Sequence, residues 1–185
     1  LGVRGVKITV EKAIPRHVGL GSTTQTSLAV AFAVARLYGL NYGVRELALI
    51  LGRGRDSGIG VATFEFGGFV VDSGRIIGGK GVVDPPRSVD DIPLPVIRKK
   101  LPRDWYFLVF IPKKRRGLNE SEERRAMDRP AKLPKDLQYE LYKLVLLHII
   151  PSIERGDVDT FGRAITKLQL IVGEYFSKYQ GGVFC

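Results

Sequence analysis

Apolar and polar residues alternate near the start of the chain, which predicts a β-strand over residues 3–13. Val6, Ile8 and Val10 are apolar and the residues between them are polar, and this two-residue period is typical of a half-buried strand. Residues 24–37 are small or apolar on nearly every helical face, which predicts a buried helix rather than an amphipathic surface helix. A strand is therefore expected to lead through a short loop into a buried helix.

The middle of the chain predicts shorter elements. A helix is expected over residues 45–51, and the apolar run 68–74 followed by 75–77 is typical of a strand and its hairpin return. Several prolines make residues 78–103 loop-rich, and residues 105–111 form a strongly apolar strand candidate. Strands and helices mixed without regular alternation indicate an α+β fold.

The last part of the chain is predicted to be helical. One helix is expected over residues 136–154 with a bend near Pro151, and a second over residues 158–178 with Asp157 as its N-cap. His148 lies inside the first of these helices, where we expect a structural hydrogen bond.

Composition favours an anionic partner. The 185 residues include 29 Lys and Arg against 19 Asp and Glu, a net charge of +10. The only dense basic run is 113–116, and other cations such as Lys80 are dispersed, so phosphorylated metabolites are favoured over nucleic acid.

The single cysteine, Cys185, and the lack of a long apolar run predict a cytoplasmic protein without a membrane partner. Both chain ends are expected to be truncated.

The turn Gly19-Leu20-Gly21-Ser22 before the first helix is the candidate phosphate cradle. Glycines let an anion approach successive backbone N–H groups, and the helix N-terminus favours negative charge. The hydroxyls of Ser22, Thr23 and Thr24 could add hydrogen bonds, and Ser22 could contact a bound Mg²⁺. The alternative is a tight turn in which Ser22 or Thr23 only caps the helix. The loop is neither a Walker A loop nor a dinucleotide fingerprint.

The string Pro15-x-x-x-Gly-Leu-Gly-Ser-Thr-Thr24 resembles the second conserved motif of the GHMP superfamily of small-molecule kinases. The resemblance implies phosphate contacts from Gly19, Gly21, Ser22 and Thr23. It also implies a GHMP-kinase-like fold of two subdomains. The first would be like ribosomal protein S5 and the second ferredoxin-like, and we place them at residues 1–103 and 104–185.

A second glycine-rich loop departs from the kinase pattern. Many GHMP kinases have an aspartate that acts as base where this chain has Gly60, in the stretch Asp56-Ser-Gly-Ile-Gly60. Residues 52–72 instead resemble the β-ribofuranosylaminobenzene 5′-phosphate synthase branch, also called β-ribofuranosylphenol 5′-phosphate synthase, of archaeal methanopterin biosynthesis. The similarity runs from about residue 14 to residue 72 and resumes at 105–112. In that branch a glycine-rich motif nearer the C-terminus completes the site, and this chain ends before it.

The resemblance implies a glycosyltransferase that joins phosphoribosyl pyrophosphate to 4-hydroxybenzoate or 4-aminobenzoate and releases CO₂ and pyrophosphate, with Mg²⁺ as cofactor. The alternatives are an ATP-dependent GHMP kinase and a non-catalytic binding module. Homodimer formation is left open. The candidate catalytic residues are His17, Asp56 and Asp72. The candidate substrate-binding residues are Arg16, Gly19, Gly21, Ser22, Thr23, Thr24, Arg53, Arg55, Ser57 and Gly58, and Ser22 is the candidate metal ligand.

Each candidate outside the first loop has a structural alternative. Asp72 could begin a hairpin turn, and Asp56 could pair with Arg53 or Arg55 at the surface. His17 could be a packing residue. Arg16 or Lys80 could hold the carboxylate of the benzoate.

Overall fold

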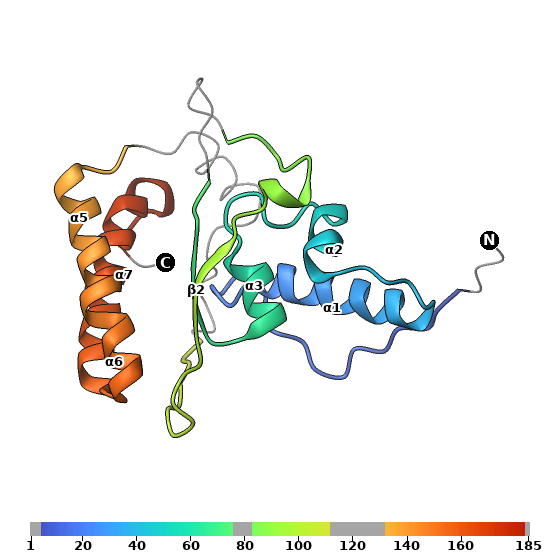
Figure 1. Ribbon diagram of the computed structural model, residues 1–185, viewed down its shortest axis with the longest axis horizontal. Helices are drawn as coiled ribbons and strands as arrows, with labels where there is room; N and C mark the ends of the chain where they lie inside the picture. The colour runs from blue at the N-terminus through green and yellow to red at the C-terminus, as the bar shows by residue number, and fades with distance from the viewer. Residues whose placement is uncertain (1–4, 76–82, 112–131, 184–185) are drawn as a thin grey trace.

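The computed structural model describes residues 5–75, 83–111 and 132–183. In Figure 1 the helices gather in two groups on opposite sides of a small sheet, with α1, α2 and α3 on one side and α5, α6 and α7 on the other. The basic run 113–116 and Lys80 lie outside the described residues. Among those described, no helix is long and apolar enough to cross a membrane.

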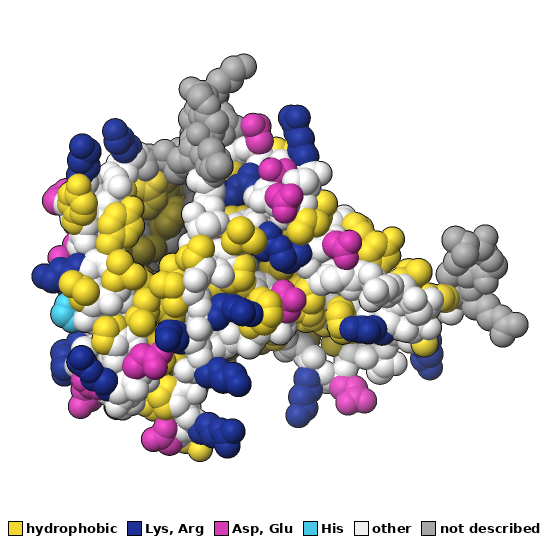
Figure 2. Space-filling view, in the orientation of Figure 1, with side chains coloured by type: hydrophobic (Ala, Val, Ile, Leu, Met, Phe, Trp, Pro, Cys, Tyr) yellow, Lys and Arg dark blue, Asp and Glu magenta, His cyan; other side chains and the backbone are white. Residues whose placement is uncertain are grey.

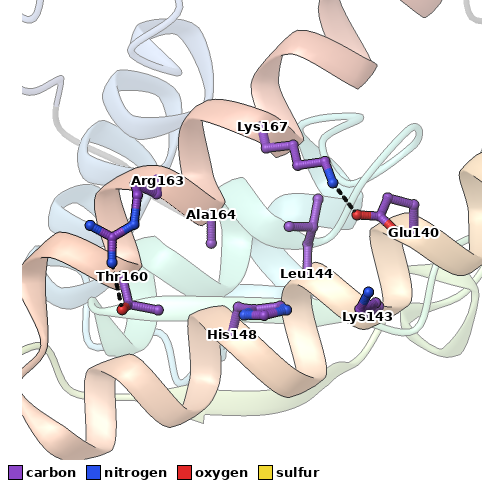
Figure 3. A pocket seen from close by; sticks show the side chains of 8 residues that line it. All are labelled: Glu140, Lys143, Leu144, His148, Thr160, Arg163, Ala164 and Lys167. Carbon is purple, nitrogen blue, oxygen red and sulfur yellow. Dashed lines mark hydrogen bonds and ion pairs between the residues drawn. The ribbon is translucent and has the colours of Figure 1, made fainter.

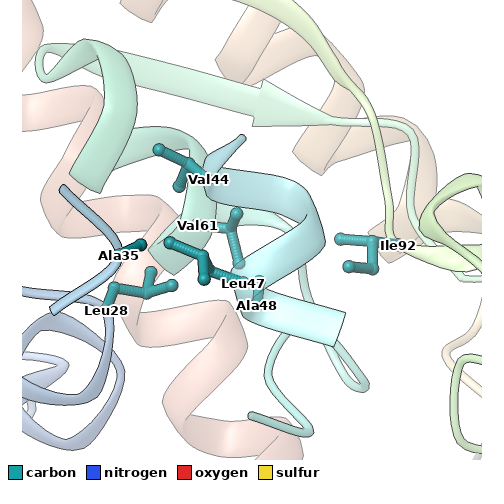
Figure 4. Packing of buried hydrophobic residues seen from close by; sticks show 7 residues of the cluster. All are labelled: Leu28, Ala35, Val44, Leu47, Ala48, Val61 and Ile92. Atoms are coloured by element: carbon teal, nitrogen blue, oxygen red, sulfur yellow. The ribbon is translucent and has the colours of Figure 1, made fainter. Parts of the chain in front are cut away.

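The first group consists of α1 (Ser22–Leu37), α2 (Val44–Ile50) and α3 (Ile59–Phe66). Their apolar faces meet in one cluster (Figure 4), formed by Leu28, Ala35, Val44, Leu47, Ala48, Val61 and Ile92. The predicted helices 24–37 and 45–51 are confirmed, whereas α3 was not predicted. Only one face of α1 is covered by α2 and α3, so this helix is less buried than its composition predicts.

The sheet has two antiparallel strands, β1 (Phe69–Asp72) and β2 (Pro95–Lys99). Phe69 pairs with Lys99, and the register shifts between Val71 and Asp72. The strand predicted within residues 68–74 is therefore confirmed as β1, whereas most of its predicted hairpin return, 75–77, lies outside the described residues. The return strand lies in the stretch 78–103 that was expected to be loop, after a short 3₁₀ helix, η1 (Val89–Asp91). Pro95 starts β2 at the irregular end of the ladder, where a missing N–H is tolerated.

The second helical group begins with a nearly continuous helix. It comprises α5 (Lys135–Lys143), a π-helical turn η2 (Leu144–Ile149) and α6 (Ile150–Arg155). Where the sequence predicted a bend near Pro151, the helix has a wider π-helical turn just before the proline. Proline has no backbone N–H, so it cannot donate the helical hydrogen bond at this point.

The last helix, α7 (Val158–Gln180), packs against η2 and α6. Asp157 caps it, because its carboxylate accepts from the Thr160 N–H at 2.9 Å, as the sequence predicts. The core of this group also takes in Phe69 and Trp105, so β1 and the segment after β2 connect the two halves of the molecule.

Two predicted strands do not form. Residues 5–13 and 105–111 adopt no regular structure, and apart from Trp105 their large apolar side chains are exposed, with Ile8 at 53%, Tyr106 at 91% and Phe110 at 82%. The alternating and apolar patterns are present, but neither segment has a hydrogen-bonded strand partner among the described residues. Without such a partner a strand leaves its N–H and C=O groups unpaired. The observed mixture of helices with a small antiparallel sheet agrees with the α+β class.

Candidate functional site

The glycine loop places left-handed backbone directly before α1. Gly19 and Gly21 have φ values of 76° and 62°, and Gly21 is the N-cap of the helix. Among the described residues, His17 is the one non-glycine residue with a positive φ, 60°. No side chain in the described parts caps α1, so the alternative in which Ser22 or Thr23 caps the helix does not hold. The first-turn N–H groups of α1 are therefore not satisfied by a capping side chain.

The described residues leave space over this loop. Apart from its own chain neighbours, a Cβ atom built on Gly19 or on Gly21 would meet no atom of these residues within 4 Å. Ser22, the first helical residue, is only 6% exposed, whereas Thr23 and Thr24 are half-buried beside it. The loop thus presents backbone groups and the partly exposed Thr23 and Thr24 to a region that the described residues leave open, which is the geometry that an anion at a helix N-terminus requires.

The second glycine loop lies directly against the first turns of α1. The Gln25 side-chain amide donates to the Gly60 carbonyl at 2.8 Å. A Cβ atom at Gly60 would stand 3.2 Å from the Thr24 Cγ2, so a side chain here would press on the phosphate-loop helix. The N-terminal ends of α1 and α3 are therefore neighbours. Gln25 was not among the predicted site residues, and a polar residue in a helix gives no sequence signal for this contact.

Asp72 holds the N-terminus of α3. Its Oδ2 accepts from the Ser57 hydroxyl at 2.9 Å and from the Gly58 N–H at 2.7 Å, and its Oδ1 accepts from the Gly74 N–H at 3.0 Å. The hydrogen bond with Gly74 closes a local turn that begins at Asp72, as the sequence suggested. The contacts with Ser57 and Gly58 join the end of β1 to α3. The Asp72 carboxylate therefore binds the hydroxyl of Ser57 and the N–H of Gly58, two groups that the sequence analysis proposed as substrate-binding.

The remaining predicted residues surround these two loops. Arg53 and Arg55 are half-buried, and Arg55 donates to the Val83 carbonyl at 3.1 Å. Arg16 and Asp56 are exposed, and His17 is half-buried. These positions leave the roles assigned to Arg16, His17, Arg53 and Asp56 as predictions.

Close packing fixes the path of the second loop. A Cβ atom at Gly54 would lie 2.7 Å from the Ile92 Cγ2, and one at Gly58 would lie 2.2 Å from the Pro93 carbonyl oxygen. Arg45 binds the same segment from the other side, donating to the carbonyls of Val89 and Ile92 at 2.8 and 2.7 Å. The glycines of this loop therefore serve packing at least as much as ligand approach.

No group of three His, Cys, Asp or Glu side chains in the described ranges is arranged to hold a metal ion. Mg²⁺, however, commonly binds through one or two protein oxygens together with substrate phosphates and water. Ser22, the candidate metal ligand, stands at the start of α1, where a metal bound in this manner would arrive together with its phosphate ligand.

Comparison with known proteins gives the same family as the motifs. Residues 1–68 match the family model described as the GHMP kinases N terminal domain. The chain is 39% identical to the β-ribofuranosylphenol 5′-phosphate synthase of Methanothermobacter thermautotrophicus, over 87% of this chain and 49% of that protein. It is 38% identical to the synthase of the same name from Archaeoglobus fulgidus, over 90% of this chain and 53% of that protein.

A third relative of the same name, from Methanocaldococcus jannaschii, is 33% identical over 92% of this chain and 53% of its own length. The chain thus spans about half the length of the curated relatives it matches. The predicted resemblance is confirmed: residues 1–68 carry a GHMP kinases N terminal domain, within a chain that is similar over most of its length to β-ribofuranosylphenol 5′-phosphate synthases.

Proposed function

We propose that this chain supplies the phosphate-binding part of a glycosyltransferase that condenses phosphoribosyl pyrophosphate with 4-hydroxybenzoate or 4-aminobenzoate. The observation that carries the proposal is the α1 N-terminus, which follows Gly21, has no side-chain cap and has room above Gly19 and Gly21 among the described residues. The names of the three relatives support the choice of reaction. They do not favour the alternative, an ATP-dependent kinase.

The proposed reaction needs no protein nucleophile. The ring carbon that bears the carboxylate attacks C1 of the ribose, and the bond from C1 to the pyrophosphate oxygen breaks. The carboxylate then leaves as CO₂, and the electron pair of the broken bond restores the aromatic ring. The protein must therefore stabilise a positively charged sugar and a departing pyrophosphate, which positioned dipoles and cations can do. Mg²⁺, when bound, would add positive charge at the leaving pyrophosphate.

The residues of the site divide these tasks. Backbone N–H groups after Gly19 and Gly21 and the hydroxyls of Ser22 to Thr24 bind one phosphate group. Half-buried Arg53 and Arg55 supply positive charge near the second loop, since arginine suits phosphate contacts. Asp72 acts as a positioning residue, because its carboxylate is held by Ser57 and Gly58.

Gly60 also fits a reaction without a protein base. It occupies the place of the kinase aspartate, and the Thr24 methyl group lies where its Cβ atom would point. Cytoplasmic location, homodimer formation and the choice of benzoate remain predictions.

We further propose that the complete fold has two subdomains, 1–103 and 104–185, each continued by polypeptide outside this chain. The relatives are about twice as long as the region they share with it. Segments 5–13 and 105–111 have strand patterns, mostly exposed apolar side chains and no strand partner in the part of the chain that the structure describes. In the proposed S5-like and ferredoxin-like subdomains, these segments become strands when the remaining polypeptide pairs with them.

A hybrid protein tests the reaction. This chain would replace the matching part of the Methanothermobacter thermautotrophicus relative, and release of labelled CO₂ from carboxyl-labelled 4-hydroxybenzoate and 4-aminobenzoate would be measured with phosphoribosyl pyrophosphate and Mg²⁺. We expect CO₂ release that depends on phosphoribosyl pyrophosphate and is matched by pyrophosphate. A folded hybrid that consumes ATP and releases no CO₂ would replace the synthase proposal with the kinase.

A further inference from the structure

A groove of about 430 Å³ runs between α7 and the helix formed by α5 and η2. Figure 3 shows Leu144 and Ala164 between the two walls, where both are buried and form an apolar floor. Figure 1 places these helices on the far side of β2 from α1, so the groove is separate from the glycine loop. Its volume falls within the range of small-molecule sites, roughly 300–1,000 Å³.

The rim of the groove is mostly cationic. Lys143, Arg163 and Lys167 line it, against a single carboxylate, Glu140. Lys167 forms an ion pair with Glu140, and this contact holds the pKa of the Glu140 carboxyl below its ordinary value. Arg163 donates to the Thr160 hydroxyl at 3.1 Å, and its charge also helps to hold the pKa of the Asp157 carboxyl below its ordinary value. The rim therefore carries an excess of two positive charges.

The π turn brings two of the rim residues together. In an α-helix, residues five apart lie on different faces, whereas the wider π turn closes on residues five apart. Lys143 and His148 have this separation, and both line the groove along the edge of η2 (Figure 3). A π turn is uncommon and often occurs at functional sites, and here it adds a ring N–H or nitrogen to the cationic rim.

We propose that this groove binds a small phosphate-bearing anion through Lys143, His148, Arg163 and Lys167, at a site distinct from the glycine loop. The apolar floor under a cationic rim suits a compact ligand with two or more negative charges. In Figure 2, Lys and Arg side chains also gather on this side of the molecule. Guanidinium and ammonium groups on facing helices can contact different oxygens of one phosphate or pyrophosphate group.

The two histidines of the chain make the test specific. His17 belongs to the glycine loop and His148 to the groove, and the sequence contains no other histidine. Their imidazole proton resonances would be followed by NMR at constant pH during titration with inorganic pyrophosphate, with signals assigned from His17→Gln and His148→Gln variants. We expect the His148 signal to shift saturably, with a binding constant separate from that of any shift at His17.

Variants complete the test. The Lys143→Gln/Arg163→Gln double variant, whose altered side chains are exposed, should weaken the His148 response about tenfold or more while leaving the helical circular dichroism unchanged. Arg103→Gln removes an exposed arginine outside the groove and should leave it unchanged. A His148 signal that does not shift, that shifts without saturation, or that responds equally in both variants would overturn the proposal. Displacement of pyrophosphate by a short RNA at lower concentration would replace the small anion with nucleic acid.

Discussion

The left-handed conformation of Gly21 allows a direct test of the phosphate loop. A Cβ atom at this position would enter open space, so Gly21→Ala creates no clash. The cost in stability comes from the backbone alone, because alanine disfavours φ of 62° by about 1–2 kcal/mol. For a protein of this size, that cost lowers the melting temperature by roughly 2–8 °C.

The effect on ligand binding should be larger than the effect on stability. The new methyl group would stand over the loop, where an anion must approach the N–H groups of α1. Losing even one charge-assisted hydrogen bond costs about 1.5–3 kcal/mol, which lowers affinity by about tenfold to a hundredfold. We therefore expect Gly21→Ala to bind phosphoribosyl pyrophosphate with Mg²⁺ at least about tenfold more weakly than the unaltered chain.

Gly39 provides a matched control at the other end of the same helix. Its φ is 66°, and a Cβ atom there would also meet nothing within 4 Å. Gly39→Ala should lower the melting temperature by a similar amount and leave ligand affinity unchanged. Melting temperature would be measured by circular dichroism and affinity by calorimetry. Equal affinities of the two variants would refute the assignment of the loop as a phosphate site.

Two further substitutions test the structure around the site, and a third tests the cap of α7. Gly58→Ala would place a Cβ atom 2.2 Å from the Pro93 carbonyl oxygen, so thermal unfolding should show a loss of roughly 1–3 kcal/mol from overpacking. Asp72→Asn keeps the shape of the side chain but weakens its bonds to Ser57 and Gly58. It should lower the melting temperature and detach α3 from β1, seen as faster amide exchange at Gly58. Hydrogen bonds from Thr160 hold the pKa of Asp157 below its ordinary value of 3.8, so its contribution to stability is present above that value and is lost as pH falls through the lower, folded-state pKa. Asp157→Asn should accordingly flatten the acid limb of the unfolding curve, measured as melting temperature below about pH 4.

Local signals in the sequence predicted the helices well. The small apolar run before Gly39 gave α1, and the predicted cap at Asp157 is present in the structure. These features depend on residues close together in the sequence. The phosphate loop was predicted for the same reason, because two glycines and a hydroxyl run sit directly before a helix.

Long-range pairing was predicted less well. The sequence cannot show that β1 pairs with β2 across the intervening loop, because hairpin signals favour the nearest apolar run. Helix α3 was missed because its residues follow a glycine-rich stretch that indicates a loop. The apolar patterns of 5–13 and 105–111 predict strands, but a strand forms only where a partner supplies hydrogen bonds.

Side-chain contacts at the site were also beyond the sequence. Asp72 was a candidate catalytic residue, and only the structure shows its bonds to Ser57 and Gly58. The contact of Gln25 with Gly60 joins residues far apart in the chain, and no motif indicates it. Residue type and spacing therefore located the loops. The hydrogen bonds that connect the loops are seen only in the structure.

The central claim is that the α1 loop binds the phosphates of phosphoribosyl pyrophosphate rather than those of ATP. The most direct measurement is calorimetric titration of the chain with phosphoribosyl pyrophosphate and Mg²⁺, and separately with ATP and Mg²⁺, repeated on Gly21→Ala. We predict saturable binding of phosphoribosyl pyrophosphate that Gly21→Ala weakens, with weaker or undetectable binding of ATP. Preferential binding of ATP, or binding of phosphoribosyl pyrophosphate that Gly21→Ala leaves unchanged, would contradict the claim.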